Sequence, residues 1–168
     1  MEKYELYMRK ALLQASRALE EDEVPVGAII TCPVKNEISN GPAQERIIAQ
    51  AYNQVELLKD PTAHAEMIAI TQAADFLKSK WLTGCTLYVT IEPCSMCAGA
   101  LILSRISKVI FGAVDPKTGA FGSKLNINNL SLNHRIKVKQ GILEKDCAEI
   151  LQQFFQGKRG YRSGSWGC

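Results

Sequence analysis

The sequence contains no hydrophobic run long enough to cross a membrane as a helix. Its first residues, 1–5, are polar and lack the apolar core of a secretory signal. There is no internal repeat, and no low-complexity block apart from a Gly/Ser/Arg-rich stretch at the C-terminus. These absences argue against a membrane protein, a secreted protein and a repeat array, and we expect a cytoplasmic globular protein.

The length and composition are those of one ordinary domain. A chain of 168 residues with 46% hydrophobic and 22% charged residues can bury a sizeable core without needing disulfide bonds for stability. We predict a single domain over residues 1–157 and a flexible basic tail over residues 158–168. In that tail, RNA stacking by Tyr161, Arg162 and Trp166 is one interpretation, and disordered filler is the favoured one.

Six cysteines are present. In a chain without an export signal, the even number is weak grounds for disulfide bonds. Their surroundings instead predict two metal ligands (Cys94, Cys97), two small core residues (Cys85, Cys147) and two free surface thiols (Cys32, Cys168).

Positive charge is concentrated in the C-terminal third. The whole chain carries +3, whereas residues 135–168 contain seven Lys or Arg and three acidic residues. A basic segment is a plausible contact surface for nucleic-acid phosphates. The same positive charge is also expected of a solvent-exposed surface followed by a frayed C-terminal tail, with no nucleic-acid partner. From the charge alone this second interpretation is favoured.

Helical and strand patterns alternate along the chain. The predicted helices span 2–21, 64–78, 95–104 and 144–156, and the predicted strands span 24–31, 46–52, 85–91, 108–112 and 135–139. Irregular segments at 32–44, 56–62 and 115–133 connect them. Strands alternating with helices predict an α/β domain with helices on both faces of a mixed sheet.

Two short motifs stand at predicted helix starts: His64-Ala65-Glu66 and Pro93-Cys94-Ser95-Met96-Cys97. One imidazole and two thiols make three zinc ligands, the number that catalytic sites use with a fourth position left for water. Water bound to such an ion ionises near neutral pH. Glu66 is close enough in sequence to His64 to take a proton from that water and pass it to a substrate nitrogen.

The spacing of these residues favours one shared site at two helix ends. In a helix interior, His64 and Glu66 would point in nearly opposite directions, but at a helix start both can face one cavity. Cys94 and Cys97 are three residues apart and share a face of one turn, where the helix N-terminus stabilises thiolate. Each motif alone is common, whereas the pair is not, so catalytic zinc is favoured over structural zinc or no metal.

The two motifs and several segments outside them resemble the bacterial tRNA adenosine deaminases, a family of the cytidine deaminase superfamily, over residues 4–159. The segments are 23–28, 60–63, 86–92, 111–123, 133–135 and 154–155. The resemblance implies a three-layer α/β/α cytidine-deaminase-like fold around a mixed sheet of about five strands. The stretch 31–51 is longer than the hairpin usual in the family, and the tail after residue 159 matches no family motif.

The resemblance also implies roles at the metal. His64, Cys94 and Cys97 would hold one Zn²⁺ per subunit, and Glu66 would shuttle protons. The reaction would be hydrolysis of adenosine to inosine at the wobble position of a tRNA anticodon loop.

Further residues are implied to bind the substrate. Asn53 would hydrogen-bond the purine edge, and Asp115 would contact the nucleotide backbone beside the flipped base. Val26, Ala28 and Ala63 would line the base pocket. Ordinary turn capping is the alternative for Asn53 and Asp115.

Two other functions and two packing arrangements stay open. A small-molecule guanine or cytidine deaminase shares the zinc chemistry, but the 115–123 loop and the basic C-terminal segment argue against it. A non-catalytic zinc-stabilised RNA-binding module has no need of Glu66. The apolar stretch 98–103 packs either in the core or against a second subunit, and the resemblance implies a homodimer.

Overall fold

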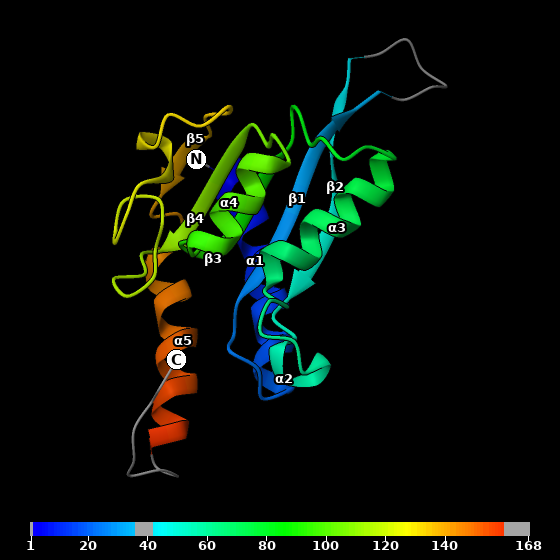
Figure 1. Ribbon diagram of the computed structural model, residues 1–168. Coiled ribbons are helices and arrows are strands. Elements are labelled where there is room, and N and C mark those ends of the chain that lie inside the picture. The colour runs from blue at the N-terminus through cyan, green and yellow to red at the C-terminus, as the bar shows by residue number, and fades with distance from the viewer. Residues whose placement is uncertain (1, 36–41, 160–168) are drawn as a thin grey trace.

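The structure is a computed structural model that describes residues 2–35 and 42–159 (Figure 1). In chain order the elements are α1 (Glu2–Glu20), β1 (Gly27–Val34), β2 (Gln44–Tyr52), α2 (Val55–Leu58), α3 (Ala65–Leu77), β3 (Thr86–Ile91), α4 (Ser95–Leu103), β4 (Lys108–Ala113), the 3₁₀ turn η1 (Ile127–Asn129), β5 (Lys137–Gln140) and α5 (Glu144–Arg159). None of the helices in these two stretches is long and apolar enough to span a membrane.

The last helix continues past the predicted domain boundary at residue 157. α5 includes Lys158, whose ammonium lies 2.7 Å from the Asp22 carboxylate. The rest of the predicted tail, with Tyr161, Arg162, Trp166 and Cys168, lies outside the described residues.

Strand pairing extends into both ends of the predicted irregular segment at 32–44. β1 and β2 pair as far as Val34 opposite Gln44, and Pro33 lies inside β1. Pairing of β1 with β3 ends at Thr31. Pro33 is therefore tolerated, because its missing N–H is not needed by a second neighbouring strand.

The five strands form one mixed sheet in the order β2-β1-β3-β4-β5. β1 runs antiparallel to both β2 and β3, whereas β3, β4 and β5 are parallel to one another. Parallel pairing places Ile91 at the end of β3 beside Ala113 at the end of β4. The chain therefore leaves both strands at the same edge of the sheet.

Helices cover both faces of the sheet, which confirms the predicted three layers (Figure 1). Side chains alternate between the faces because successive strand residues point opposite ways. Ala28, Ile30 and Leu87 pack with α3 and α4, whereas Ile29 and Tyr88 pack with α1 and α5.

The side of α3 that faces the sheet is built from alanines. Ala65, Ala69 and Ala73 recur every four residues and are fully buried. The larger residues Met67, Ile68 and Ile70 of the same helix are only half-buried. Small side chains at the contact let the helix axis approach the sheet closely, so the larger ones lie at its flanks.

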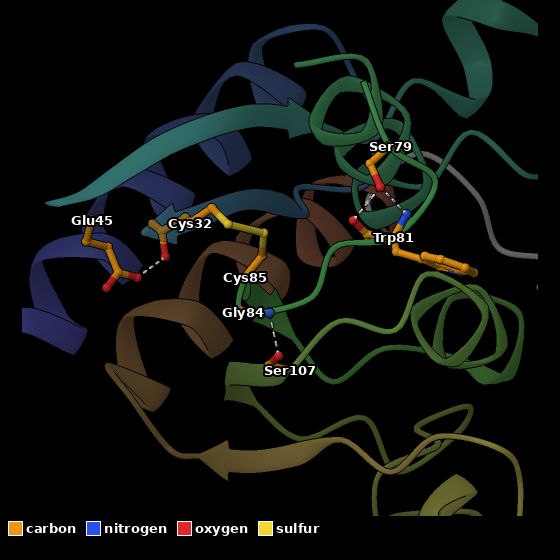
Figure 2. The surroundings of a disulfide bond; sticks show 8 residues. Cys32, Glu45, Ser79, Trp81, Gly84, Cys85 and Ser107 are labelled. Carbon is orange, nitrogen blue, oxygen red and sulfur yellow. Dashed lines mark hydrogen bonds between the residues drawn. A yellow bond between two sulfur atoms is a disulfide. The ribbon is translucent and has the colours of Figure 1, made fainter. Parts of the chain in front are cut away.

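Cys32 and Cys85 form a disulfide bond between β1 and β3, so the predicted free surface thiol at Cys32 is wrong (Figure 2). Thr31 lies opposite Thr86 in the antiparallel pairing. The next residues outward, Cys32 and Cys85, face each other with Cα atoms 4.3 Å apart, and both are buried. Cys147 is a buried free thiol, as predicted.

The contact between α1 and β1 requires glycine at position 27. A Cβ atom on Gly27 would overlap the carbonyl oxygen of Ala11 and the amide nitrogen of Ala15. Both are helix backbone atoms, so α1 would have to move away from the sheet to accept any other side chain.

We expect Gly27→Ala to lower the free energy of unfolding by about 3 kcal/mol, because the methyl group overpacks a backbone contact. Urea denaturation with linear extrapolation measures the change. Gly157→Ala is the matched control, since a Cβ atom there has no neighbour within 4 Å in α5. The control should gain about 0.5–1 kcal/mol from helix propensity. Equal stability of the two variants would contradict the packing argument.

Candidate metal centre

His64 and Glu66 reach the site from the first turn of α3. His64 is the N-cap residue, with an extended backbone and no side-chain capping bond, so its imidazole is free for other contacts. Its Nδ1 atom lies 3.7 Å from Cys94 Sγ and 3.5 Å from Cys97 Sγ. Glu66 is 2% exposed and is close enough to His64 and Cys94 to interact with their charges. The predicted convergence of His64, Glu66 and the two cysteines is therefore present.

The N-terminus of α3 is capped by Asn53 from the end of β2. Asn53 Oδ1 accepts a hydrogen bond of 2.8 Å from the amide of Ala65. The amide of Asn53 donates in turn to the carbonyl of Val26. Asn53 thus caps a helix 12 residues along the chain, which differs from the local turn capping that we gave as the alternative. Its side-chain NH₂ group donates to no acceptor among the described residues and is left for another partner.

Cys94 and Cys97 lie at the start of α4. Cys94 is the N-cap residue, and its carbonyl accepts the hydrogen bond from Ala98 N. Cys97 follows within the first turn and is fully buried, whereas Cys94 is half-buried. The i, i+3 spacing brings both sulfur atoms to the same side of the helix, as predicted.

The three donor atoms fit a tetrahedral zinc ion. The His64, Cys94 and Cys97 donor atoms all lie within 4.8 Å of one another. With Zn–S of about 2.3 Å and Zn–N of about 2.0 Å, tetrahedral geometry puts sulfur and nitrogen about 3.5 Å apart. The two measured distances are 3.5 and 3.7 Å. Among the described residues no fourth His, Cys, Asp or Glu joins the group, which is the donor count of a catalytic site.

The two thiols differ in their affinity for protons. Hydrogen bonds from Cys97 first, and then from His64, lower the pKa of Cys94 to about 4 despite its burial. The pKa of Cys97 is raised, because it donates to Cys94 and is buried. The hydrogen bond to Cys94 also raises the pKa of His64. Cys94 therefore carries thiolate, and a metal ion would have to displace the proton of Cys97.

Glu66 has a carboxyl group suited to proton transfer. Burial raises its pKa to about 7, against the opposing effects of a backbone hydrogen bond and the nearby His64. A group that titrates near the working pH both accepts and releases protons efficiently.

Asp115 shapes the loop that follows β4. Its Oδ1 atom accepts from the amides of Lys117 and Thr118, and its Oδ2 atom accepts from the Thr118 hydroxyl. These contacts are the turn capping that we gave as the alternative for this residue. The loop also lies against the metal-ligand segment, since Gly119 forms an isolated antiparallel bridge with Cys94.

The three predicted pocket residues differ in exposure. Val26 and Ala63 are nearly buried and adjoin Asn53, through the bond from Asn53 N to Val26 O and the bond from Gln54 N to Ala63 O. Ala28 has no exposed surface and belongs to the core beneath α3 and α4.

Sequence analysis did not single out two buried carboxylates that organise backbone segments, Glu23 and Glu92. Glu23 accepts hydrogen bonds from the amides of Glu56 and Leu57 and so fixes the start of α2. Glu92 accepts from the loop that carries Asp115. The feature of the sequence that could have indicated these two residues is an acidic residue directly beside an apolar strand.

One lysine of the basic C-terminal segment, Lys139, lies on the side of the sheet away from α3 and α4. Lys139 on β5, together with Lys108 on β4, lies over the ring of Tyr4 at 5.5 and 5.8 Å from its centroid. Tyr4 belongs to α1, on the face of the sheet opposite to α3 and α4. The Lys139 ammonium therefore lies on the other side of the sheet from the helices that carry His64 and Cys94.

A cavity of about 630 Å³ lies elsewhere, near the C-terminal end of α4. Its lining includes Trp81, Leu103 and Arg105, and none of the metal ligands. The Arg105 guanidinium lies 4.6 Å from the centroid of the Trp81 ring.

The sequence matches a known family along almost its whole length. Residues 2–159 match the profile of the MafB19-like deaminases. The chain is 49% identical over 156 residues to the tRNA-specific adenosine deaminase of Aquifex aeolicus (strain VF5), covering 92% of this chain and 95% of that one. It is 44% identical to the tRNA-specific adenosine deaminase of Bacillus subtilis (strain 168), covering 92% and 90%.

Solved structures share the fold. One from biochemical and structural studies of A-to-I editing by tRNA:A34 deaminases has a TM-score of 0.72 at 39% identity, covering 85% of this chain and 96% of that one. A guanine deaminase from Nitrosomonas europaea has a TM-score of 0.71 at 23% identity, covering 89% and 83%. The second likeness concerns the fold alone.

We expect the protein to bind one equivalent of Zn²⁺, with an apparent affinity that falls as the pH falls. The cause is the raised pKa of Cys97, whose proton must leave, so the affinity should change about tenfold per pH unit. Competition with a chelator at two pH values one unit apart measures this slope.

Cys97→Ser should lose tight Zn²⁺ binding at both pH values. Ser95→Ala changes the exposed residue between the two cysteines, and this control should bind like the unchanged protein. An affinity independent of pH would show that the ligands are already deprotonated.

Proposed function

Because the chain belongs to the tRNA-specific adenosine deaminase family, we propose that it converts adenosine to inosine at the wobble position of a tRNA anticodon loop and releases ammonia. One observation carries the proposal: a three-donor metal group with no fourth described ligand stands beside a buried carboxylate. Structural zinc sites close with four protein ligands, so an open set favours chemistry.

One Zn²⁺ per subunit is the proposed cofactor, with His64, Cys94 and Cys97 as its ligands. When bound, the ion would supply the Lewis acidity that makes water a nucleophile near neutral pH. A donor set of one imidazole and two thiols suits Zn²⁺ better than Mg²⁺ or Ca²⁺, which prefer oxygen.

Glu66 is the proposed catalytic residue. Its buried carboxyl would take a proton from the attacking water and deliver it to a ring nitrogen of the purine. It would then take the second proton from the hydroxyl of the C6 adduct and pass it to the amine that leaves C6. Water adds at C6 and ammonia departs, so the protons balance. The pKa near 7 supports both halves of this cycle.

Asn53 is the proposed donor to the purine edge. Its Oδ1 atom is held by Ala65 N, which orients the amide and leaves the NH₂ group for an acceptor on the base. Val26 and Ala63 flank it as proposed walls of the pocket, and Ala28 lies behind them. Asp115 is proposed to lie beside the ribose–phosphate backbone of the flipped nucleotide, where the turn that it caps would meet the RNA.

A homodimer is the proposed assembly, with the outward side of α4 as its interface. Ala98, Leu101 and Ile102 are buried in the core, whereas Leu103 is 81% exposed. A Cβ atom on Gly99 would have no neighbour within 4 Å. One side of the stretch 98–103 therefore packs in the core, as the first of the two arrangements has it. Its outward side is available to pack against a second copy, as the second has it. We place the enzyme in the cytoplasm.

Inosine mapping after incubation with bulk tRNA tests the activity. We expect inosine at one anticodon position and release of ammonia, with no ammonia from free guanine or cytidine. Glu66→Ala should keep zinc and tRNA binding but lower the rate by about 10² to 10⁴, the usual contribution of a general acid–base. Unchanged turnover in this variant would refute the proton shuttle. Deamination of free guanine or cytidine without tRNA inosine would refute the substrate class.

Leu103→Glu should convert the dimer into a monomer, because a charge would be buried in an apolar interface. Size-exclusion chromatography with light scattering measures the mass. Leu13→Glu is the matched control, since Leu13 is 58% exposed on α1, on the opposite face of the sheet. The control should keep twice the chain mass. A monomeric unchanged protein would end the dimer proposal.

A further inference from the structure

Glu92 is a buried carboxylate between the last residue of β3 and the metal-ligand segment. It is 2% exposed, yet it forms no ion pair among the described residues. Its charge is balanced by hydrogen bonds alone. Oε2 accepts from Asp115 N at 3.0 Å and from the Ser123 hydroxyl, and Oε1 accepts from Phe121 N at 3.0 Å and from Ser123 N at 3.1 Å.

The chemistry of a carboxylate matches this set of donors. An ionised carboxylate accepts at about four lone-pair positions and donates nothing, and three N–H groups and one O–H group point at it here. A glutamine in the same place would direct the two N–H bonds of its own NH₂ group toward donors of the loop. The site therefore requires the acid and not its neutral analogue.

The 115–123 loop wraps closely around this carboxylate. A Cβ atom on Gly119 would overlap the Glu92 carboxylate and the carbonyl oxygen of Asp115. The loop also bonds to residues that follow Glu92, through Ala120 N to the carbonyl of Pro93 at 2.9 Å and through the bridge between Gly119 and Cys94. The loop and the metal-ligand segment thus form one unit with Glu92 at its centre.

We propose that Glu92 is a positioning residue that holds the 115–123 loop against the metal-ligand segment and so sets the affinity for RNA. The inference rests on the proposed function in one respect, namely that this loop contacts the substrate. Glu92 transfers no proton, since its acceptor positions are filled from the loop. Its loss should impair the binding of RNA and leave the chemistry on bound adenosine nearly intact.

Steady-state kinetics on an anticodon stem-loop RNA separate positioning from a merely structural role. Glu92→Gln should raise KM about tenfold or more, with kcat within about threefold and zinc content unchanged. Ser123→Ala removes one of the four donors and should raise KM less. Once the carboxylate is gone, adding Ser123→Ala to Glu92→Gln should cost little more, because the two residues share one interaction.

Hydrogen exchange gives a readout that needs no substrate. Glu92→Gln should speed exchange at the amides of Asp115, Phe121 and Ser123. Glu23→Gln is the matched control, because it removes another buried carboxylate that accepts backbone amides. The control should speed exchange at Glu56 and leave the 115–123 loop unchanged.

The outcomes distinguish this inference from the proposed function. Should Glu92→Gln fail to fold, Ser123→Ala alone still removes one donor to the carboxylate, and its smaller rise in KM is expected. Unchanged KM, a fall in kcat alone, or unchanged exchange in the loop would overturn the role of Glu92. Faster loop exchange in a protein that makes no inosine in tRNA would instead refute the proposed function.

Discussion

The parallel pairing of β3 with β4 is the constraint on which the rest of the site depends. It sets Ile91 beside Ala113, so the segment with Cys94 and the loop with Asp115 start at the same edge of the sheet. The loop that leaves β4 needs acceptors for its amides, and Glu92, which directly follows β3, accepts three of them. A metal-ligand segment and a polar loop thereby become one structural unit.

The two helix starts at this edge use their cap positions in an unusual way. His64 and Cys94 occupy the N-caps of α3 and α4, where Ser, Thr, Asp or Asn commonly caps with its side chain. Their side chains turn toward the metal centre instead, and α3 receives its cap from Asn53. The positive ends of both helix dipoles also approach the Cys94 thiolate and favour its charge.

Prediction from the sequence succeeded where the chemistry depends on neighbouring residues. His64 and Glu66, or Cys94 and Cys97, lie within one helical turn, so residue type and spacing are enough to place them together. The limits of helices and strands were near those observed. Prediction failed for Cys32, because its bond to Cys85 depends on the register between strands 53 residues apart in the sequence.

The sequence by itself determined the group of one histidine and two cysteines, the acid beside it and the alternation of strands and helices, because each depends on local spacing. Only the tertiary structure decided that α3 faces the sheet with alanines and that Asn53 caps this helix. It alone revealed Glu92 at the junction of two loops. The physical reason is that these features arise from contacts between distant segments, and strand register and close packing create those contacts.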